Sequence, residues 1–439
     1  MGEAAKISLN AIGKQDTYLL SKDPDESFFN YKVPPNHSQF RKYQRARNII
    51  NPGQIVGWPF NQTIKVEFNP TNMGDLLSNM WLSVTVPGIS DGNYADQLGR
   101  HLLKSVTMFV NEIEVEKVHD DWGIIYDELY LEMSEKVANR FLVNRNLGYD
   151  TAPQNTSVAQ YASELLIPLH FFFSRKYASD EYSSNKPNRP YFPVCAARLQ
   201  KIEFDLEFHK QTFFTNTTNL LELPSFNLIT EEITVSPEER QYLMNEKQIL
   251  ITDLVRKHPT TINEENIDFI QNNLVPNIPV KCIHWFLRNE IFENDDISVG
   301  NPLDEETFYS QNRYNFSSSV NFDQIQTFYN PIMENASFYI NGSKLPNITN
   351  TNHNYYKYLI PFKNRLARPF RNIYTYSFSM NPVNVEPSGN LDFSQIQSDK
   401  TRIEVKLRSE LKSNTYSLNM YYTGYQTFEF ENGSMSVAY

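Results

Sequence analysis

The sequence has little cysteine, little glycine and no long apolar run. Cys195 and Cys282 are the only cysteines among 439 residues, too few for a disulfide framework, which indicates a reducing compartment. No apolar run approaches the roughly 18 residues that a membrane span needs. Met1–Ile7 lacks the pattern of a signal peptide, and Lys6 stands where an N-myristoylation motif requires Ser or Thr. From these features we expect a chain that is neither secreted nor anchored in a membrane.

Positive charge is also scarce. Lys and Arg total 40 against 51 Asp and Glu, which leaves a net charge of −11. A general nucleic-acid binder normally carries a basic surplus. We therefore expect no direct contact with nucleic acid.

Catalytic and metal-binding motifs are missing as well. The chain has no GxSxG, P-loop or GxGxxG, and its eight His show neither HExxH nor Cys–His metal spacing. The nearest metal candidate is His119-Asp120-Asp121, but neighbours on an extended chain point to opposite sides. Because Asp suits the first turn of a helix, we interpret this stretch as a polar helix start. We expect His284, within an apolar strand, to be a satisfied and half-buried histidine.

Two acidic stretches are candidates for the paired catalytic carboxylates of a glycosidase. The first contains Glu293, Asp295 and Asp296, and the second is Asp304-Glu305-Glu306. Glycosidase chemistry needs two carboxyls held about 5–9 Å apart across a cleft, and acidic loops are usually just solvated. We therefore expect no enzyme activity, no cofactor and no metal.

What the chain does contain is aromatic and turn-rich. Aromatics make up 14%, with 30 Phe and 26 Tyr, and 47 Asn and 24 Pro stand against 15 Gly. Such a composition favours strands and turns over helices. A helix or a helical loop is predicted over Trp122–Ser134, and a helix is predicted from Ser236-Pro237 onward. Short strands are predicted at Ile64–Phe68, Met80–Val86, Ser105–Val110, Ile113–Val115, Leu165–Phe173, Leu199–Phe208, Ile249–Val255, Lys281–Leu287, Ala336–Ile340, Ile373–Met380, Arg402–Leu407 and Ser417–Tyr422.

The two halves of the chain resemble each other. Ser105–Val115 aligns with Asn335–Leu345, and Lys201–Phe208 aligns with Arg402–Ser409 in the same order. The unequal offsets indicate loops of different length. The pattern predicts two duplicated β domains of about 200 residues, joined near Leu223-Pro224.

Nine Asn-x-Ser/Thr sequons are candidate N-glycosylation sites, although Asn-rich loops produce many such triplets by chance. They lie at Asn36, Asn61, Asn155, Asn216, Asn315, Asn335, Asn341, Asn347 and Asn432.

Motifs along most of the chain resemble the major capsid protein of nucleocytoplasmic large DNA viruses. The most specific stretch is Ile373–Asn390 (IYTYSFSMNPVNVEPSGN) followed by Phe393-Ser394, despite Asn372, Glu386 and Asp392 where that family usually has Gly, Gln and Asn. Other similar segments, in the family's order, are Ala11–Leu19 with Phe28-Phe29, Leu76–Val86, Gly99–Met108, His119–Leu129, Ile167–Phe173, Arg189–Phe192, Ala196–Phe208 and Ile233–Asp253.

The resemblance implies an all-β protein of two tandem eight-stranded antiparallel jelly rolls with short helices in the loops. The expected division is an N-terminal arm over 1–27, a first jelly roll over 28–223 and a second over 224–439. The resemblance further implies a homotrimeric, pseudo-hexagonal capsomer that tiles an icosahedral virion shell and is assembled in the host cytoplasm. The implied partners are neighbouring capsomers and minor capsid and penton proteins, with an inner membrane contacted only indirectly.

One basic stretch stands against the overall charge. Phe40–Arg47 contains Arg41, Lys42, Arg45 and Arg47, which could contact a partner on the inner side of the shell or lie in a solvated loop. The alternatives to a major capsid protein are a related viral structural protein (a scaffold, minor or penton protein), a carbohydrate-active jelly-roll enzyme and an adhesion module.

Overall fold

The structure is a computed structural model of the chain. It describes residues 41–48, 62–89, 94–95, 97–143, 162–175, 191–215, 217, 219, 221, 225–264, 266–293, 314, 316–318, 330–348, 351–383 and 387–438.

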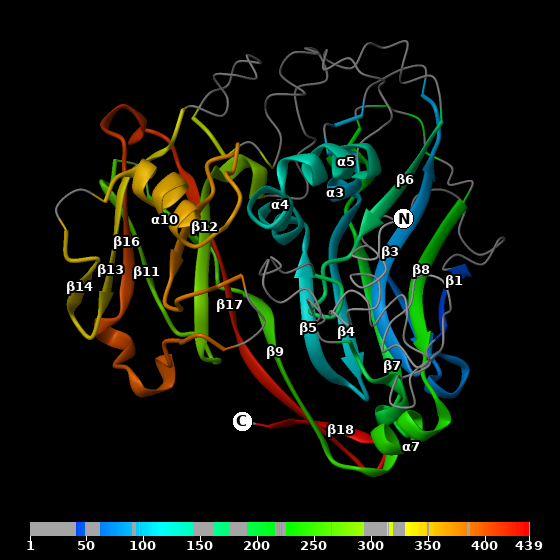
Figure 1. Ribbon diagram of the computed structural model, residues 1–439. Helices are drawn as coiled ribbons and strands as arrows, with labels where there is room; N and C mark the ends of the chain where they lie inside the picture. The colour runs from blue at the N-terminus through cyan, green and yellow to red at the C-terminus, as the bar shows by residue number, and fades with distance from the viewer. Residues whose placement is uncertain are drawn as a thin grey trace, which may run out of the picture.

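The first half of the chain folds into two four-stranded antiparallel sheets (Figure 1). One sheet has the order β1-β8-β3-β6, formed by Arg41–Asn48, Ser225–Thr234, Leu76–Val86 and Ser163–Pro168. The other has the order β2-β7-β4-β5, formed by Thr63–Phe68, Ile202–Phe208, Leu103–Val110 and Ile113–His119. Eight strands in this arrangement make a jelly roll.

The second half repeats the arrangement. One sheet runs β10-β17-β12-β15, formed by Thr261–Ile262, Tyr416–Glu431, Val280–Asn289 and Tyr374–Ser377. Strands β9 (Gln248–Lys257) and β18 (Ser434–Ala438) also pair with β17. Because β9 and β10 follow the same edge of β17, they form one edge strand interrupted at Pro259, which lacks an N–H for the ladder. The facing sheet runs β11-β16-β13-β14, formed by Phe269–Asn273, Arg402–Leu407, Met333–Ile340 and Ser343–Leu345.

The duplication predicted from the sequence is confirmed by this topology. The aligned hairpins are β4–β5 and β13–β14, and the aligned single strands are β7 and β16; each pair holds the same place in its roll. The all-β fold of two eight-stranded jelly rolls is likewise confirmed.

The expected junction at Leu223-Pro224 falls just before β8. Strand β8 pairs with β1 and β3, so the strand pairing assigns Ser225–Thr234 to the first roll. Sequence similarity could not reveal this, because the closing strand of a jelly roll inserts between strands from the start of the same domain. We therefore propose a domain boundary after Thr234.

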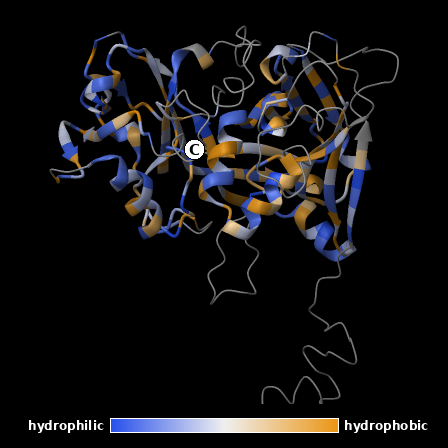
Figure 2. Cartoon of the chain, turned by 90° about the horizontal axis from the view of Figure 1, so that it is seen from above, coloured by the Kyte–Doolittle hydropathy of each residue, from blue (hydrophilic) through white to orange (hydrophobic). Residues whose placement is uncertain are grey.

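Strand burial explains why the sequence patterns differ between strands. In β7 (IEFDLEF) buried and half-buried residues alternate, because one face meets the core and the other lies toward solvent. In β12 (VKCIHWFLRN) the first nine residues are all buried, because the sheet has the second roll's core on one face and the first roll on the other. Figure 2, seen from above, shows the hydrophobic segments gathered most densely in the middle of the molecule and in the half that holds the first roll.

Helices are short and lie in the connections between strands. The α-helices are α3 (Leu98–Leu102), α4 (Asp120–Leu129), α5 (Met133–Val143), α7 (Pro237–Asn245) and α10 (Ile360–Lys363). A π-helical segment, η5, covers Tyr355–Leu359, and 3₁₀ turns cover Pro70–Asn72, Val194–Ala197, Gln211–Phe213, Glu290–Glu293, Phe393–Gln395, Ser398–Lys400 and Ser409–Leu411. Among the residues that the structure describes, no helix is long and apolar enough to cross a membrane.

Several predicted elements differ in extent. The helix predicted over Trp122–Ser134 is two helices, α4 and α5, separated at Tyr130–Glu132. The strands predicted over Leu165–Phe173 and Ile373–Met380 end at Pro168 and Ser377. After Pro168 the chain turns into the core, where Phe171, Phe172 and Phe173 are buried, whereas after Ser377 it turns outward and leaves Met380 91% exposed. The start of α7 is as predicted: Ser236 Oγ accepts the Glu239 N–H at 3.2 Å.

Candidate functional site

The basic stretch predicted as a contact or a solvated loop is strand β1, at the edge of the first sheet. Lys42 Nζ lies 3.0 Å from Glu231 and Arg45 lies 4.0 Å from Glu232, both on β8. Arg45 also donates to the carbonyl of Asn72. Two of the four cations are thus engaged within the chain. Arg41 and Arg47 lie on the same strand, and their side chains are outside the description.

Four of the nine sequons lie among the described residues. Asn341 and Asn432 are exposed at hairpin turns with φ of 50° and 53°, and Asn347 is also exposed. Asn335 is half-buried within β13. Asn36, Asn61, Asn155, Asn216 and Asn315 lie outside the described residues. Glycosylation stays a prediction, and among the four described sequons three are exposed to solvent.

The polar helix start at His119–Asp121 lies at the junction of the two rolls. Asp120 Oδ2 lies 3.0 Å from His209 Nε2 and accepts the Tyr314 hydroxyl at 3.4 Å. Asp121 forms an ion pair with Arg288 of β12 at 2.8 Å and accepts the Tyr421 hydroxyl of β17 at 3.2 Å. The predicted helix start is therefore confirmed, and its two acids also bind the second half of the chain.

The other end of α4 makes a second polar contact across the junction. Glu128 accepts Arg371 Nη1 at 2.7 Å and the backbone N–H of Phe370 at 2.7 Å. The carbonyl of Leu129 accepts the N–H of Ala367, also at 2.7 Å. Helix α4 is therefore held by its partners in the second roll at both ends.

A third contact is centred on Glu116, whose side chain is fully buried. It accepts Arg175 Nη1 at 2.8 Å and the N–H of Phe172 at 2.8 Å from the first roll. It also accepts the N–H of Val255, on β9, at 2.9 Å. Because a buried carboxylate is costly unless it is satisfied, these donors must all stay in place together.

His284 lies on β12 between the two rolls. Its Nε2 is 3.0 Å from the Tyr130 hydroxyl of the first roll, and its Nδ1 is 2.9 Å from Thr375 Oγ1. Burial lowers the pKa of this imidazole to about 3, so the ring is neutral near pH 7. The predicted satisfied histidine is confirmed, although it is completely buried.

The C-terminal hairpin β17–β18 reaches back onto the first roll. Phe430 packs its ring 5.9 Å from Phe192, and Phe428 lies 6.0 Å from Phe172. The amide of Gln200 donates to the Met435 carbonyl at 3.1 Å and accepts its N–H at 2.6 Å. Residues of both rolls thus share one buried hydrophobic cluster.

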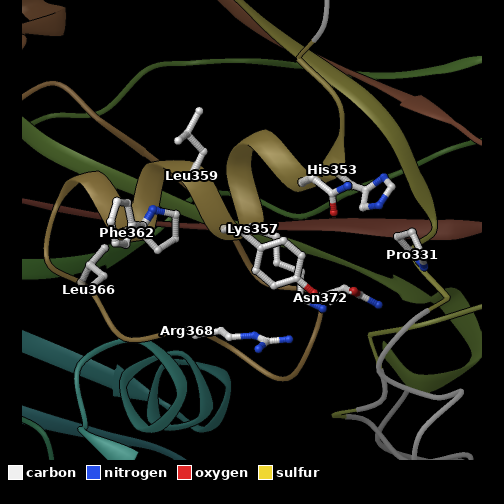
Figure 3. A pocket seen from close by; sticks show the side chains of 11 residues that line it. Pro331, His353, Lys357, Leu359, Phe362, Leu366, Arg368 and Asn372 are labelled. Atoms are coloured by element: carbon white, nitrogen blue, oxygen red, sulfur yellow. Dashed lines mark hydrogen bonds between the residues drawn. The ribbon is translucent and has the colours of Figure 1, made fainter.

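A pocket of about 790 Å³ lies beside η5 and α10 (Figure 3). Phe362 and Leu366 lie next to each other at one end of it, and Pro331 lies at the other. Lys357 is buried there and donates to the Phe370 carbonyl at 3.0 Å and to Asn372 Oδ1 at 2.8 Å. Burial lowers the pKa of this ammonium to about 8. The lining residues include cations but no carboxylate.

A site for a metal ion is not seen in the described part of the chain. No group of three or more His, Cys, Asp or Glu there could hold a metal ion. Glu293 accepts a hydrogen bond from Asn419 and pairs with Arg288. The remaining residues of the two acidic stretches lie outside the described residues.

The sequence reasoning missed the basic partners at the junction between the rolls. Arg288 lies near the end of an apolar strand, and Arg371 lies two residues before the family-like motif that begins at Ile373. The available signal was a charged residue at the end of an otherwise apolar run, which tends to mark a buried ion pair. It could not identify the partner, because Asp121 and Glu128 lie far away in the sequence.

The polar contacts described so far hold two domains in a fixed relation and offer no reacting centre. They define a structural subunit made of two jelly rolls. Residues 231–437 match the family model for the large eukaryotic DNA virus major capsid protein, and residues 48–220 match the model for the major capsid protein N-terminus. The chain belongs to the major capsid protein family of large eukaryotic DNA viruses.

Two curated relatives are similar in sequence. The major capsid protein of Pyramimonas orientalis virus is 26% identical over 283 residues, which cover 64% of this chain and 64% of the relative. The chain thus matches somewhat less than two thirds of that relative's length. The major capsid protein of Paramecium bursaria Chlorella virus 1 is 19% identical over 416 residues, or 89% of this chain and 84% of the relative.

Two solved structures share the fold. VP54 of PBCV-1 superposes with a TM-score of 0.70 at 16% identity, covering 94% of this chain and 100% of VP54. The Faustovirus major capsid protein gives a TM-score of 0.62 at 13% identity, covering 96% of this chain and 98% of that protein. At these identities the likeness establishes the double jelly-roll fold alone.

Proposed function

We propose that the chain forms a homotrimer with a pseudo-hexagonal outline, which tiles the icosahedral outer shell of a large DNA virus. The observation that carries this proposal is the repetition of one strand order in two rolls of a single chain. Three such chains bring six similar rolls into one ring. A trimer with threefold symmetry then has a nearly hexagonal outline and can pack with six neighbours.

The oligomeric state of the purified full-length chain tests the proposal. Light scattering at micromolar concentration should give three times the chain mass of 51.3 kDa. Negative-stain images should show particles with a hexagonal outline. A stable, folded monomer under the same conditions would contradict the proposal.

The partners we propose follow from this role. They are neighbouring capsomers, minor capsid proteins and penton proteins, in virions assembled in the host cytoplasm. The net charge of −11 supports a shell that does not touch the genome directly and meets an inner membrane only indirectly. Cross-linking of purified virions followed by mass spectrometry would identify the actual neighbours, and abundant cross-links to nucleic acid would contradict this assignment.

A minor, penton or scaffold protein with the same fold is the second candidate, because these proteins can share the double roll. Copy number separates the two possibilities. The major protein should dominate a stained gel of purified virions, whereas a band at a few per cent of the total would favour the second candidate.

We propose that strand β1 provides a contact on the inner side of the shell, through Arg41, Lys42, Arg45 and Arg47. Support comes from its basic character on an acidic chain and from its place at a sheet edge. Because Lys42 and Arg45 have partners on β8, replacing them with Gln should also lower stability. Replacing only Arg41 and Arg47 with Gln separates the two effects. That pair should reduce virion yield while trimers form normally, and an unchanged yield would refute the contact.

A further inference from the structure

The contact between the two rolls follows a regular pattern on the second roll. One row of residues crosses four strands on the outer face of its sheet: Lys257 of β9, Tyr421 of β17, His284 of β12 and Thr375 of β15. Helix α4 and the residue that follows it cover this row. The Trp122 ring lies 5.9 Å from His284 and 6.3 Å from Tyr421, and Tyr130 binds His284.

The first roll carries the equivalent row in the same strand order. It crosses β1, β8, β3 and β6 at Ala46, Ile229, Trp81 and Pro168. Within β3, Met80 and Leu82 point into the core and are 2% and 0% exposed, so Trp81 between them faces outward. Trp81 and Ile229 are only partly buried, and neither belongs to the buried hydrophobic clusters of the described residues. The row is more apolar than its counterpart.

The second roll also has an equivalent of the covering helix. Helix α4 lies in the connection between the fifth and sixth strands of the first roll, β5 and β6. Segments η5 and α10 lie in the same connection of the second roll, between β14 and β15. They expose Leu359 by 52% and Phe362 by 83%, and they line the pocket described above. An exposed aromatic side chain such as Phe362 beside a pocket is typical of a surface that binds a partner protein.

We propose that η5 and α10 of a second copy of this chain cover the Ala46–Pro168 row, repeating between chains the contact that α4 makes within the chain. The inference rests on the proposed trimer and names its interface. Figure 1 shows β1, β8 and β3 at one side of the molecule and the second roll with α10 at the other, so one chain can meet the next head to tail. Such a contact closes into a ring when its rotation allows. Three chains would then form a ring of six rolls, in which contacts within a chain alternate with contacts of the same kind between chains.

Replacing Phe362 with Asp tests the covering side. Because its side chain is 83% exposed, the substitution should leave the fold and its circular dichroism unchanged. A charge in the centre of the interface should weaken each contact roughly 30-fold or more, so that monomers appear at micromolar concentration. The matched control is Tyr242→Asp on α7, an aromatic residue 59% exposed on a different helix, which should keep the trimer. A trimer that persists unchanged in Phe362→Asp would overturn the inference.

A cysteine pair tests both sides together. The native thiols are buried and burial raises their pKa values to about 11 and about 12, so Cys195 and Cys282 should not react in the folded chain. A Trp81→Cys/Phe362→Cys double variant treated with a short bismaleimide should give covalent dimers and trimers on a denaturing gel. Each single variant should give none. Ile229→Cys replaces Trp81→Cys if that variant fails to fold.

The outcomes separate this interface from the trimer itself. Trimers by light scattering without cross-linking in either double variant would overturn the interface and leave the proposed function standing. A wild-type chain that is monomeric would overturn the proposed trimer and this inference with it.

Discussion

The carboxylate of Asp121 and the guanidinium of Arg288 lie 2.8 Å apart, and neither side chain is exposed to solvent. Asp121 lies in the first turn of helix α4 of the first roll, and Arg288 belongs to β12 of the second. The guanidinium carbon also lies 4.9 Å from the Phe286 ring centre. A charge pair in such surroundings constrains geometry more than it adds stability, because desolvation offsets much of its attraction. Its place between two rolls suggests that it keeps their relative orientation.

We therefore expect Asp121→Ala to destabilise the chain strongly. It would leave Arg288 buried with one fewer anion, at a cost of about 3–5 kcal/mol in the free energy of unfolding. Denaturant titration at fixed protein concentration measures this. Glu67→Ala is the control, since it breaks the exposed Glu67–Lys201 pair (59% and 47% exposed), which contributes about 0–1 kcal/mol. Equal losses in the two variants would contradict the structural role.

An Asp121→Leu/Arg288→Met double variant provides a second check. With both charges gone, apolar side chains fill the site, and the loss should be smaller than in Asp121→Ala. If the pair sets the orientation, the double variant should fold stably and yet form fewer regular hexagonal particles. Particles as regular as those of the wild type would argue against that role.

His284 should make the subunit less stable in acid. Burial lowers the pKa of its imidazole to about 3, against an ordinary value of about 6.5. Between these two pKa values the unfolded chain binds a proton at His284 that the folded chain does not. The contribution of His284 to the free energy of unfolding is therefore at its full value above about pH 6.5. As the pH falls from 6.5 toward 3, the free energy of unfolding decreases by about 1.4 kcal/mol per pH unit.

Unfolding midpoints measured from pH 7 to pH 4 can isolate this contribution. His284→Phe should be less stable at pH 7, because Tyr130 and Thr375 lose a partner, but its stability should depend less on pH. The control His353→Gln, at a half-buried position beside the pocket, should keep most of the wild-type slope. An identical slope in His284→Phe and the wild type would show that the imidazole is not the titrating group.

The C-terminal hairpin should be required for the stability of the first roll. Phe430 is 1% exposed and lies in the cluster shared by both rolls. Phe430→Ala should cost about 3–5 kcal/mol, through the lost burial and the cavity it leaves. The measurement is denaturant unfolding followed by the fluorescence of the Trp residues. The exposed Ile249, also in the second roll, gives the control Ile249→Ala, which should change stability little. Comparable effects would mean that the hairpin is not part of the core.

Both cysteines are free, in agreement with the expectation of a chain without a disulfide framework, and the structure shows that both are buried. Burial raises the pKa of the Cys282 thiol to about 12 and that of Cys195 to about 11. A thiol reagent should therefore label neither in the folded chain and both after denaturation. Fast labelling of the folded chain, or only one labelled thiol after denaturation without reductant, would contradict this.

Much of the fold could be predicted because it depends on local patterns. The alternation in β7 and β16, and the turn at Asn432-Gly433 with φ of 53° and 81°, are properties of a few neighbouring residues. Where local patterns were ambiguous, the predictions were less accurate. Leu169–Phe173 is as apolar as a strand, yet it leaves the sheet after Pro168 to fill the core.

The candidate site could be predicted only in part. The helix start at Asp120-Asp121 follows from the preference of acids for a first helical turn. Its binding to Arg288 and Tyr421 does not, because those residues lie far along the chain and only folding brings them near. The same holds for Lys42 and Arg45, whose partners on β8 become neighbours through strand pairing.

By itself, the sequence determined the all-β class, the duplication and the family, since each rests on residue types in a linear order. Tertiary structure alone decided that β8 closes the first roll and that the C-terminal hairpin completes its core. It also decided that Trp81 faces outward and that α4 binds the second roll. These contacts join segments that are distant in sequence. They depend on which faces of the sheets remain uncovered after the sheets have packed together.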